Sequence, residues 1–157
     1  MSTSLLGLAL PKEYGYVLCA TASTFFVGFW HGARVSGFRK QSGVPYPKVL
    51  AENSDMSAAE PGQKKAMYLF NCAQRAHGNY LENQPSVAIA LLVAGVQYPL
   101  WSAGLGAAWL VFRIAYAVGY TREDKSGGEG RLIGAPFWFA QLGLFGLTLW
   151  TGVQMLL

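Results

Sequence analysis

The sequence has few charged residues for its length, and this scarcity argues against an ordinary soluble domain. Only 13% of its 157 residues are Asp, Glu, Lys or Arg, whereas an average globular protein has roughly 25%. Apolar residues make up 52%. Because little chain remains outside the long apolar stretches to build a water-soluble core, we expect an integral membrane protein.

Cysteine is also scarce, which argues against two classes of structural support. Cys19 and Cys72 are the only cysteines, and no CxxC spacing occurs. A disulfide framework or a zinc site needs cysteines at characteristic spacings, so we expect neither a disulfide nor a bound metal. The basic residues that a nucleic-acid partner would require are interleaved with acidic ones, so we expect no nucleic-acid partner either.

Four long apolar segments make up most of the chain. They cover about residues 14–35, 68–98, 100–120 and 132–157. A membrane-spanning helix needs about 20 predominantly apolar residues, and each segment has that length. We therefore expect an all-α fold: one transmembrane domain over residues 1–157, built as an up-down-up-down bundle of four helices.

Basic residues cluster in two of the three connections between these segments. The first connection and its flanks contain Arg34, Arg39, Lys40, Lys48, Lys64 and Lys65, and the third contains Arg122, Lys125 and Arg131. The second connection, near residues 97–101, has none. By the positive-inside rule, the two basic connections face the cytosol and both termini lie on the far side of the membrane.

Polar residues form stripes where two of the predicted helices should meet the cytosolic face. Arg75, Asn79 and Glu82 follow i, i+4, i+7 spacing, which places them on one face of a helix, while His77 points nearly the opposite way. The third segment carries a similar stripe, made of Arg113, Tyr116 and Tyr120. Two such stripes on neighbouring helices predict a shared polar cavity.

Glu82 and Arg113 should lie at similar depth, because the second and third helices run antiparallel. An ionisable residue at membrane depth is costly and is usually functional or paired, so we expect these two side chains to pair. Polar residues can also simply hold membrane helices together. Pro85 follows the stripe and predicts a kink in the second helix.

Several stretches of the chain resemble one family of membrane proteins. They read KEYGYVLCATAS, FNCAQRAHGNYLE and FRIAYAVGYTRED. In order and over nearly its whole length, the chain is similar to the membrane-associated proteins in eicosanoid and glutathione metabolism, the MAPEG family, and most of all to its type-three microsomal glutathione transferases. The resemblance implies a homotrimer of four-helix subunits in the endoplasmic reticulum, or in the mitochondrial outer membrane, that binds glutathione between subunits near the cytosolic face.

The resemblance also implies roles for individual residues. Those expected to contact glutathione are Arg75, Asn79, Glu82, Arg113, Tyr116 and Tyr120, with His77 reaching it from the adjacent subunit. The arginine that stabilises the glutathione thiolate would be Arg131, with Arg122 as the alternative, and Tyr120 is a further candidate for catalysis. Arg34 and Arg39 are the two candidates for a contact from the first helix.

These residue types suit glutathione, which carries two carboxylates and one ammonium group. Arginine binds carboxylates through paired charge-assisted hydrogen bonds, and Glu82 suits the ammonium. The resemblance therefore implies a glutathione transferase that conjugates glutathione to lipophilic electrophiles drawn from the lipid bilayer and, as a glutathione peroxidase, reduces lipid hydroperoxides, with glutathione as co-substrate. The alternatives are a leukotriene-type synthase, in which tyrosine stands at the position of Asn83, and a non-catalytic lipid-presenting protein of the same fold.

Overall fold

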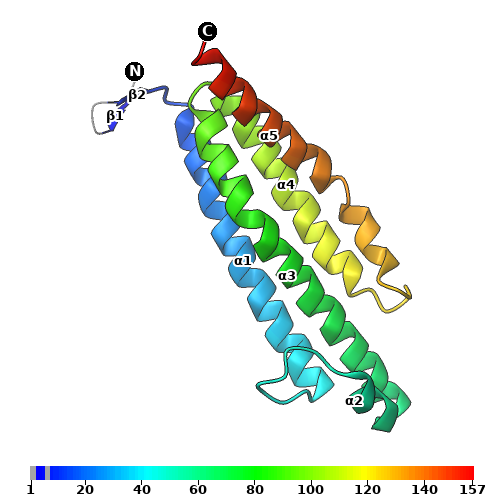
Figure 1. Ribbon diagram of the computed structural model, residues 1–157. Helices are drawn as coiled ribbons and strands as arrows, with labels where there is room; N and C mark the ends of the chain where they lie inside the picture. The colour runs from blue at the N-terminus through cyan, green and yellow to red at the C-terminus, as the bar shows by residue number, and fades with distance from the viewer. Residues whose placement is uncertain (1–2, 6–7) are drawn as a thin grey trace. The chain divides into compact units, whose positions relative to one another are not determined.

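Helices account for nearly all of the structure, a computed structural model that describes residues 3–5 and 8–157 (Figure 1). The α-helices are α1 (Tyr14–Ser42), α2 (Asn53–Ala58), α3 (Pro61–Gly95), α4 (Pro99–Tyr120) and α5 (Phe137–Gln154), and the 3-10 helix η1 covers Glu129–Gly134. Two short strands, β1 (Thr3–Leu5) and β2 (Leu8–Leu10), pair antiparallel. The all-α prediction thus holds except for this hairpin.

The helix bounds differ from the predicted segments because backbone capping, and not apolarity, ends a helix. α1 continues past residue 35 to Ser42, and Gly43 follows it with φ +67°, the left-handed conformation that commonly ends helices. α3 begins at Pro61, well before residue 68, since proline at a first helical position loses no hydrogen bond. It then continues through Pro85 to Gly95 (Figure 1).

The fourth predicted segment begins later than expected. The stretch Glu129–Gly134 forms η1, and the α-helical part starts only at Phe137. The amide of Ala135 donates to the carbonyl of Leu132 over 3.1 Å, which is the i→i+3 pattern of a 3-10 turn. Pro136, at the N-cap of α5, has no amide hydrogen with which to extend a helix backwards.

Two helices of the described residues are long and apolar enough to cross a membrane. They are Pro99–Tyr120 and Glu129–Gln154, a stretch that includes η1 and α5. Four spans were expected, so length and hydropathy support half of them. The first predicted segment is interrupted by serine, threonine and glycine, and the second by the polar stripe, which lowers the mean hydropathy of both.

The chain divides into two compact units. Unit 1 comprises Met1–Phe26, Asn83–Phe112 and Pro136–Leu157, and unit 2 comprises Val27–Glu82 and Arg113–Ala135. Unit 1 packs through close helix contacts: a Cβ on Gly106 would lie 2.6 Å from Leu91 Cδ2, so a larger residue on α4 at this point would displace the Leu91 side chain of α3. Trp109 Nε1 donates to Gln141 Oε1 over 3.0 Å, and Gln141 Nε2 donates to Asn83 Oδ1 over 2.9 Å.

Unit 2 is built on the contact between α1 and α3. The fully buried ring of Tyr80 lies 4.6 Å from the ring of His31, measured between ring centroids, and Gly28 of α1 also lies close to the Tyr80 ring. Arg34 Nη2 donates to Thr121 Oγ1 over 2.7 Å, which ties α1 to the end of α4. These contacts hold the residues of the polar stripes in place.

The connection between α1 and α3 is anchored to both helices. The backbone of Ala51 exchanges two hydrogen bonds with the side chain of Asn71, at 2.8 and 2.9 Å. Arg39 Nη1 donates to the carbonyl of Lys48 over 2.7 Å, and Lys48 Nζ lies 2.8 Å from Asp55 Oδ1. The sequence predicted only a connection here, yet this segment is folded as part of unit 2.

Candidate functional site

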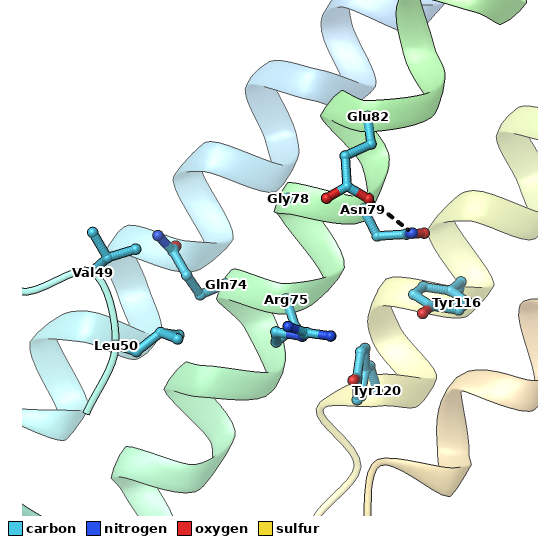
Figure 2. A pocket seen from close by; sticks show the side chains of 9 residues that line it. All are labelled: Val49, Leu50, Gln74, Arg75, Gly78, Asn79, Glu82, Tyr116 and Tyr120. Atoms are coloured by element: carbon cyan, nitrogen blue, oxygen red, sulfur yellow. Dashed lines mark hydrogen bonds between the residues drawn. The ribbon is translucent and has the colours of Figure 1, made fainter. Parts of the chain in front are cut away.

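Unit 2 contains a polar cavity of about 300 Å³ between α3, α4 and the connection after α1 (Figure 2). Its lining residues are Val49, Leu50, Gln74, Arg75, Gly78, Asn79, Glu82, Tyr116 and Tyr120. Five of these were predicted as site residues from the two stripes. The expected shared cavity is therefore present within a single chain.

Arg75 and Glu82 give the cavity one positive and one negative charge. Both side chains are exposed, and Figure 2 shows the Arg75 guanidinium directed towards Tyr120. Within the described part of the chain, Arg75 makes no hydrogen bond or ion pair that would occupy it. The Cα atoms of Arg75 and Glu82 are about 10 Å apart along the helix axis, and both side chains line the same cavity, so one small ligand can contact both.

Asn79 links Glu82 to Arg113, so the two residues that were predicted to pair are coupled through its amide and not by a direct ion pair. Arg113 Nη1 donates to Asn79 Oδ1 over 2.8 Å, and Asn79 Nδ2 donates to Glu82 Oε2 over 3.4 Å. Arg113 is fully buried and is absent from the cavity lining. Its guanidinium lies 5.0 Å from the ring centroid of Tyr116, so it supports the cavity wall from behind.

Tyr116 and Tyr120 form the α4 side of the cavity. Their ring centroids are 5.5 Å apart, with the planes at 80°, which is the edge-to-face arrangement favoured by aromatic pairs. Both rings are partly buried, so their positions are fixed by packing. The predicted stripe on the third helix therefore contributes two aromatic walls and one buried cation.

Arg131 lies next to this wall, outside the set of lining residues. Its guanidinium carbon is 5.3 Å from the ring centroid of Tyr120. Nη1 also donates to the carbonyls of Gly127 and Gly128, over 3.1 and 2.8 Å. Arg131 thus contacts a residue of the cavity and shapes the turn before η1.

Arg122, the alternative to Arg131, is held in an exposed ion pair with its neighbour in the loop. Nε and Nη2 donate to the two carboxylate oxygens of Asp124, over 2.9 and 2.6 Å. This hydrogen bonding lowers the pKa of Asp124 and raises the pKa of Arg122. Of the two candidates, only Arg131 contacts a side chain that lines the cavity.

His77 lies on a different face of α3, as its angular position predicted. Its ring stacks on that of His31 in α1, with centroids 5.9 Å apart and planes at 14°, and it does not line the cavity. The ring of His31 also packs against that of Trp30, with centroids 5.2 Å apart. A contact from His77 to a ligand held by an adjacent subunit stays a prediction.

Neither candidate arginine of the first helix lines the cavity. Arg34 is bonded to Thr121 and lies 4.9 Å from the ring centroid of Trp30. Arg39 lies 4.4 Å from the ring of Tyr46, and it holds the connection through the carbonyl of Lys48. Both arginines therefore have structural contacts inside unit 2.

Sequence reasoning missed four of the lining residues. Gln74 and Gly78 precede Glu82 at i−8 and i−4, so a wider reading of the helical face would have included them. Val49 and Leu50 carry no such signal, because they reach the cavity only through the fold of the connection. Their apolar side chains give an otherwise polar cavity one hydrophobic side.

No cluster of His, Cys, Asp or Glu suited to a metal ion occurs among residues 3–5 and 8–157. Comparison with models of protein families matches residues 17–150 to the MAPEG family. Proteins of this family are membrane-associated and are generally glutathione-dependent enzymes. They include glutathione transferases, peroxidases and leukotriene and prostaglandin synthases. Because the match covers most of the chain, including the whole polar cavity, the chain belongs to the MAPEG family.

Proposed function

We propose that this protein is an integral-membrane glutathione transferase that conjugates glutathione to lipophilic electrophiles. One observation carries the proposal: Arg75 and Glu82 present opposite charges from the same helix to one cavity. Glutathione is a small peptide with two carboxylates and one ammonium group, so its charges complement those of the cavity. The family, whose members use glutathione as a substrate, supports the same ligand.

In this proposal, each lining residue binds the group of glutathione that its side chain suits. Arg75 binds a carboxylate through its planar guanidinium, which matches carboxylate geometry better than an ammonium does. Glu82 binds the glutathione ammonium. The side-chain amide of Asn79, oriented by its hydrogen bond from Arg113, binds a peptide group or a terminus of glutathione. The hydroxyls of Tyr116 and Tyr120 are further hydrogen-bond donors.

Arg131 activates the sulfur in this proposal. A free thiol has a pKa of about 8.5, and only the thiolate is nucleophilic. Lowering that pKa by about two pH units needs roughly 2.7 kcal/mol of preferential stabilisation of the thiolate, which a positioned guanidinium can supply. The thiolate then attacks the electrophilic carbon, a carbon–sulfur bond forms, and the leaving group departs with the bonding electron pair.

Lipid hydroperoxides are the second proposed class of substrate. The thiolate sulfur attacks the terminal peroxide oxygen, the O–O bond breaks, and the lipid alkoxide takes a proton to become an alcohol. The sulfur is left as a sulfenic acid. A second glutathione then displaces water from it, giving glutathione disulfide.

We place the protein in the transferase branch of the family because of Asn83, and within that branch among the type-three microsomal enzymes because of the sequence resemblance. Asn83 stands where leukotriene-type synthases carry tyrosine, and here its Oδ1 accepts a hydrogen bond from Gln141. The amide thus takes part in contacts between α3 and α5. The physiological assembly in this proposal is a homotrimer in the endoplasmic reticulum membrane, with the cavity open to the cytosol.

The experiment uses the full chain, purified and placed in lipid nanodiscs. Glutathione binding is measured by calorimetry, and turnover is measured with a model aryl halide and with a lipid hydroperoxide. We expect saturable binding and both activities. Absence of glutathione binding would overturn the proposal, whereas binding without turnover of either substrate would favour the lipid-presenting alternative.

A further inference from the structure

A tyrosine hydroxyl on α3 holds the turn that follows α4. The amide of Gly128 donates to Tyr68 Oη over 2.8 Å. Gly127 and Gly128 adopt φ values of +59° and +70°, a left-handed conformation that favours glycine. Gly128 is buried in a loop that is otherwise exposed from Arg122 to Gly127, so its amide needs a protein partner, and Tyr68 provides it.

The same turn contacts Tyr120, which lines the cavity, and Arg131, the arginine proposed to stabilise the thiolate. A Cβ on Gly128 would overlap the ring of Tyr120 and would lie 3.0 Å from Arg131 Nη1. The turn therefore packs directly against Tyr120. Arg131 in return donates to the carbonyls of Gly127 and Gly128 while its guanidinium lies beside the Tyr120 ring.

The Tyr68 side chain stands one helical turn before Cys72 on α3, and Cys72 is buried, at 5% exposure. Tyr68 does not line the cavity. Any effect of its hydroxyl on a bound ligand must therefore pass through the turn to Tyr120 and Arg131.

We propose that Tyr68 is a positioning residue of the glutathione site, which sets the Gly127–Gly128 turn and through it the places of Tyr120 and Arg131. The inference rests on the proposed function. Arg75 and Glu82 recognise the charged ends of glutathione from α3 itself and do not depend on the turn. Loss of the Tyr68 hydroxyl should therefore impair activation of the sulfur more than it impairs glutathione binding.

The test removes the hydroxyl oxygen of Tyr68. Tyr68→Phe keeps the ring and leaves the buried Gly128 amide without its acceptor, so we expect kcat to fall about tenfold while KM for glutathione changes by less than about twofold. The pH dependence of the rate should move towards that of free glutathione, because a displaced Arg131 lowers the thiol pKa less. Tyr98→Phe is the matched control: its hydroxyl donates to Gln154 over 2.6 Å in unit 1, and we expect wild-type kinetics.

A second readout does not depend on activity. In Tyr68→Phe, hydrogen exchange at the amides of residues 126–130 should be about tenfold faster than in wild type, because the Gly128 amide opens more easily. In Arg131→Ala, adding Tyr68→Phe should reduce kcat little further, since both changes act through one turn. Tyr98→Phe should leave exchange at residues 126–130 unchanged.

Each outcome is decisive. Unchanged exchange in Tyr68→Phe would show that the hydrogen bond does not hold the turn. Faster exchange with wild-type kcat and pH dependence, or full additivity with Arg131→Ala, would show that the turn does not position the reacting groups. If wild-type protein fails to bind glutathione, the proposed function and the role of Tyr68 in it both fail, while the exchange comparison still measures the bond itself.

Discussion

Arg113 Nη1 donates a hydrogen bond to Asn79 Oδ1 across 2.8 Å, and this contact orients the amide in the cavity wall. The amide nitrogen is thereby turned towards Glu82, 3.4 Å away. A direct ion pair between Arg113 and Glu82 would have occupied the carboxylate that Glu82 presents to the cavity. With Asn79 between them, the buried cation stabilises the site and Glu82 stays available to a ligand ammonium.

Arg113→Leu should therefore destabilise the protein and weaken glutathione binding together. The change removes a buried hydrogen bond from a charged group, which is worth about 1.5–3 kcal/mol of unfolding free energy, and it frees the Asn79 amide to rotate. Thermal unfolding in detergent and calorimetry measure the two effects. Arg122→Leu, which removes an exposed ion pair, should change stability by less than about 1 kcal/mol. Equal midpoints for wild type and Arg113→Leu would contradict the structural role.

Arg75→Ala should raise KM for glutathione roughly tenfold to a hundredfold with a smaller effect on kcat, because it removes binding that substrate and transition state share. Arg75→Lys should recover part of the loss, since lysine keeps the charge without the planar fork. Lys64→Ala, an exposed residue of the same helix that does not line the cavity, serves as control. An unchanged KM in Arg75→Ala would remove this residue from the site.

Arg131→Ala should slow conjugation and leave glutathione affinity nearly intact, because the guanidinium acts on charge that appears only when the thiol ionises. The rate should partly recover at high pH, where the thiol ionises unaided. Ultraviolet difference absorbance of the thiolate follows this step as glutathione binds. Arg122→Ala is the comparison: a normal signal in Arg131→Ala with a lost signal in Arg122→Ala would assign the role to Arg122. Normal signals in both would leave Tyr116 or Tyr120 as the activating donor.

The connection between α1 and α3 should loosen at both extremes of pH. The hydrogen bond from Lys48 lowers the pKa of Asp55 below its ordinary 3.8, and the same bond raises the pKa of Lys48 above 10.5. A carboxylate whose pKa is lowered by folding stabilises the fold when the pH is above its pKa in the unfolded chain, and this stabilisation is lost as the pH falls through its pKa in the folded protein. A lysine whose pKa is raised by folding stabilises the fold when the pH is below its pKa in the unfolded chain. That stabilisation is lost as the pH rises through its pKa in the folded protein.

This pair is therefore fully formed between about pH 4 and pH 10. Limited proteolysis of the connection should show protection across that range and faster cleavage below it. Asp55→Asn should be cleaved at neutral pH as fast as wild type is at acid pH. If Asp55→Asn were as resistant as wild type at pH 7, the pair would not anchor the connection that carries Val49 and Leu50.

The placement of basic residues predicts the orientation in the membrane. In sealed microsomes, a membrane-impermeant amine reagent should label Lys64 and Lys65 from the cytosolic side, because positively charged connections stay there. A tag at the C-terminus should be modified only after the vesicles are opened. Modification of that tag in intact vesicles would reverse the predicted topology.

The sequence by itself determined the features that depend on neighbours along the chain. Helical periodicity of 100° per residue places Arg75, Asn79 and Glu82 on one face whatever surrounds the helix, and all three line the cavity. The same periodicity directed His77 elsewhere. Helix ends were predicted less well. The apolar segments indicate which residues avoid water, whereas the helices begin and end where Pro61 and Gly43 set the backbone hydrogen bonding and conformation.

Only the tertiary structure decided which distant groups meet. Asn79 bridges Glu82 and Arg113 because side-chain reach between α3 and α4 depends on how the two helices pack, which spacing within either helix does not encode. Leu50 enters the cavity wall because Asn71 fixes the backbone of the next residue, Ala51, and no local pattern marks that pair. Hydrogen bonds are short and directional, so a shift of about one ångström between helices exchanges one partner for another while leaving every sequence pattern unchanged.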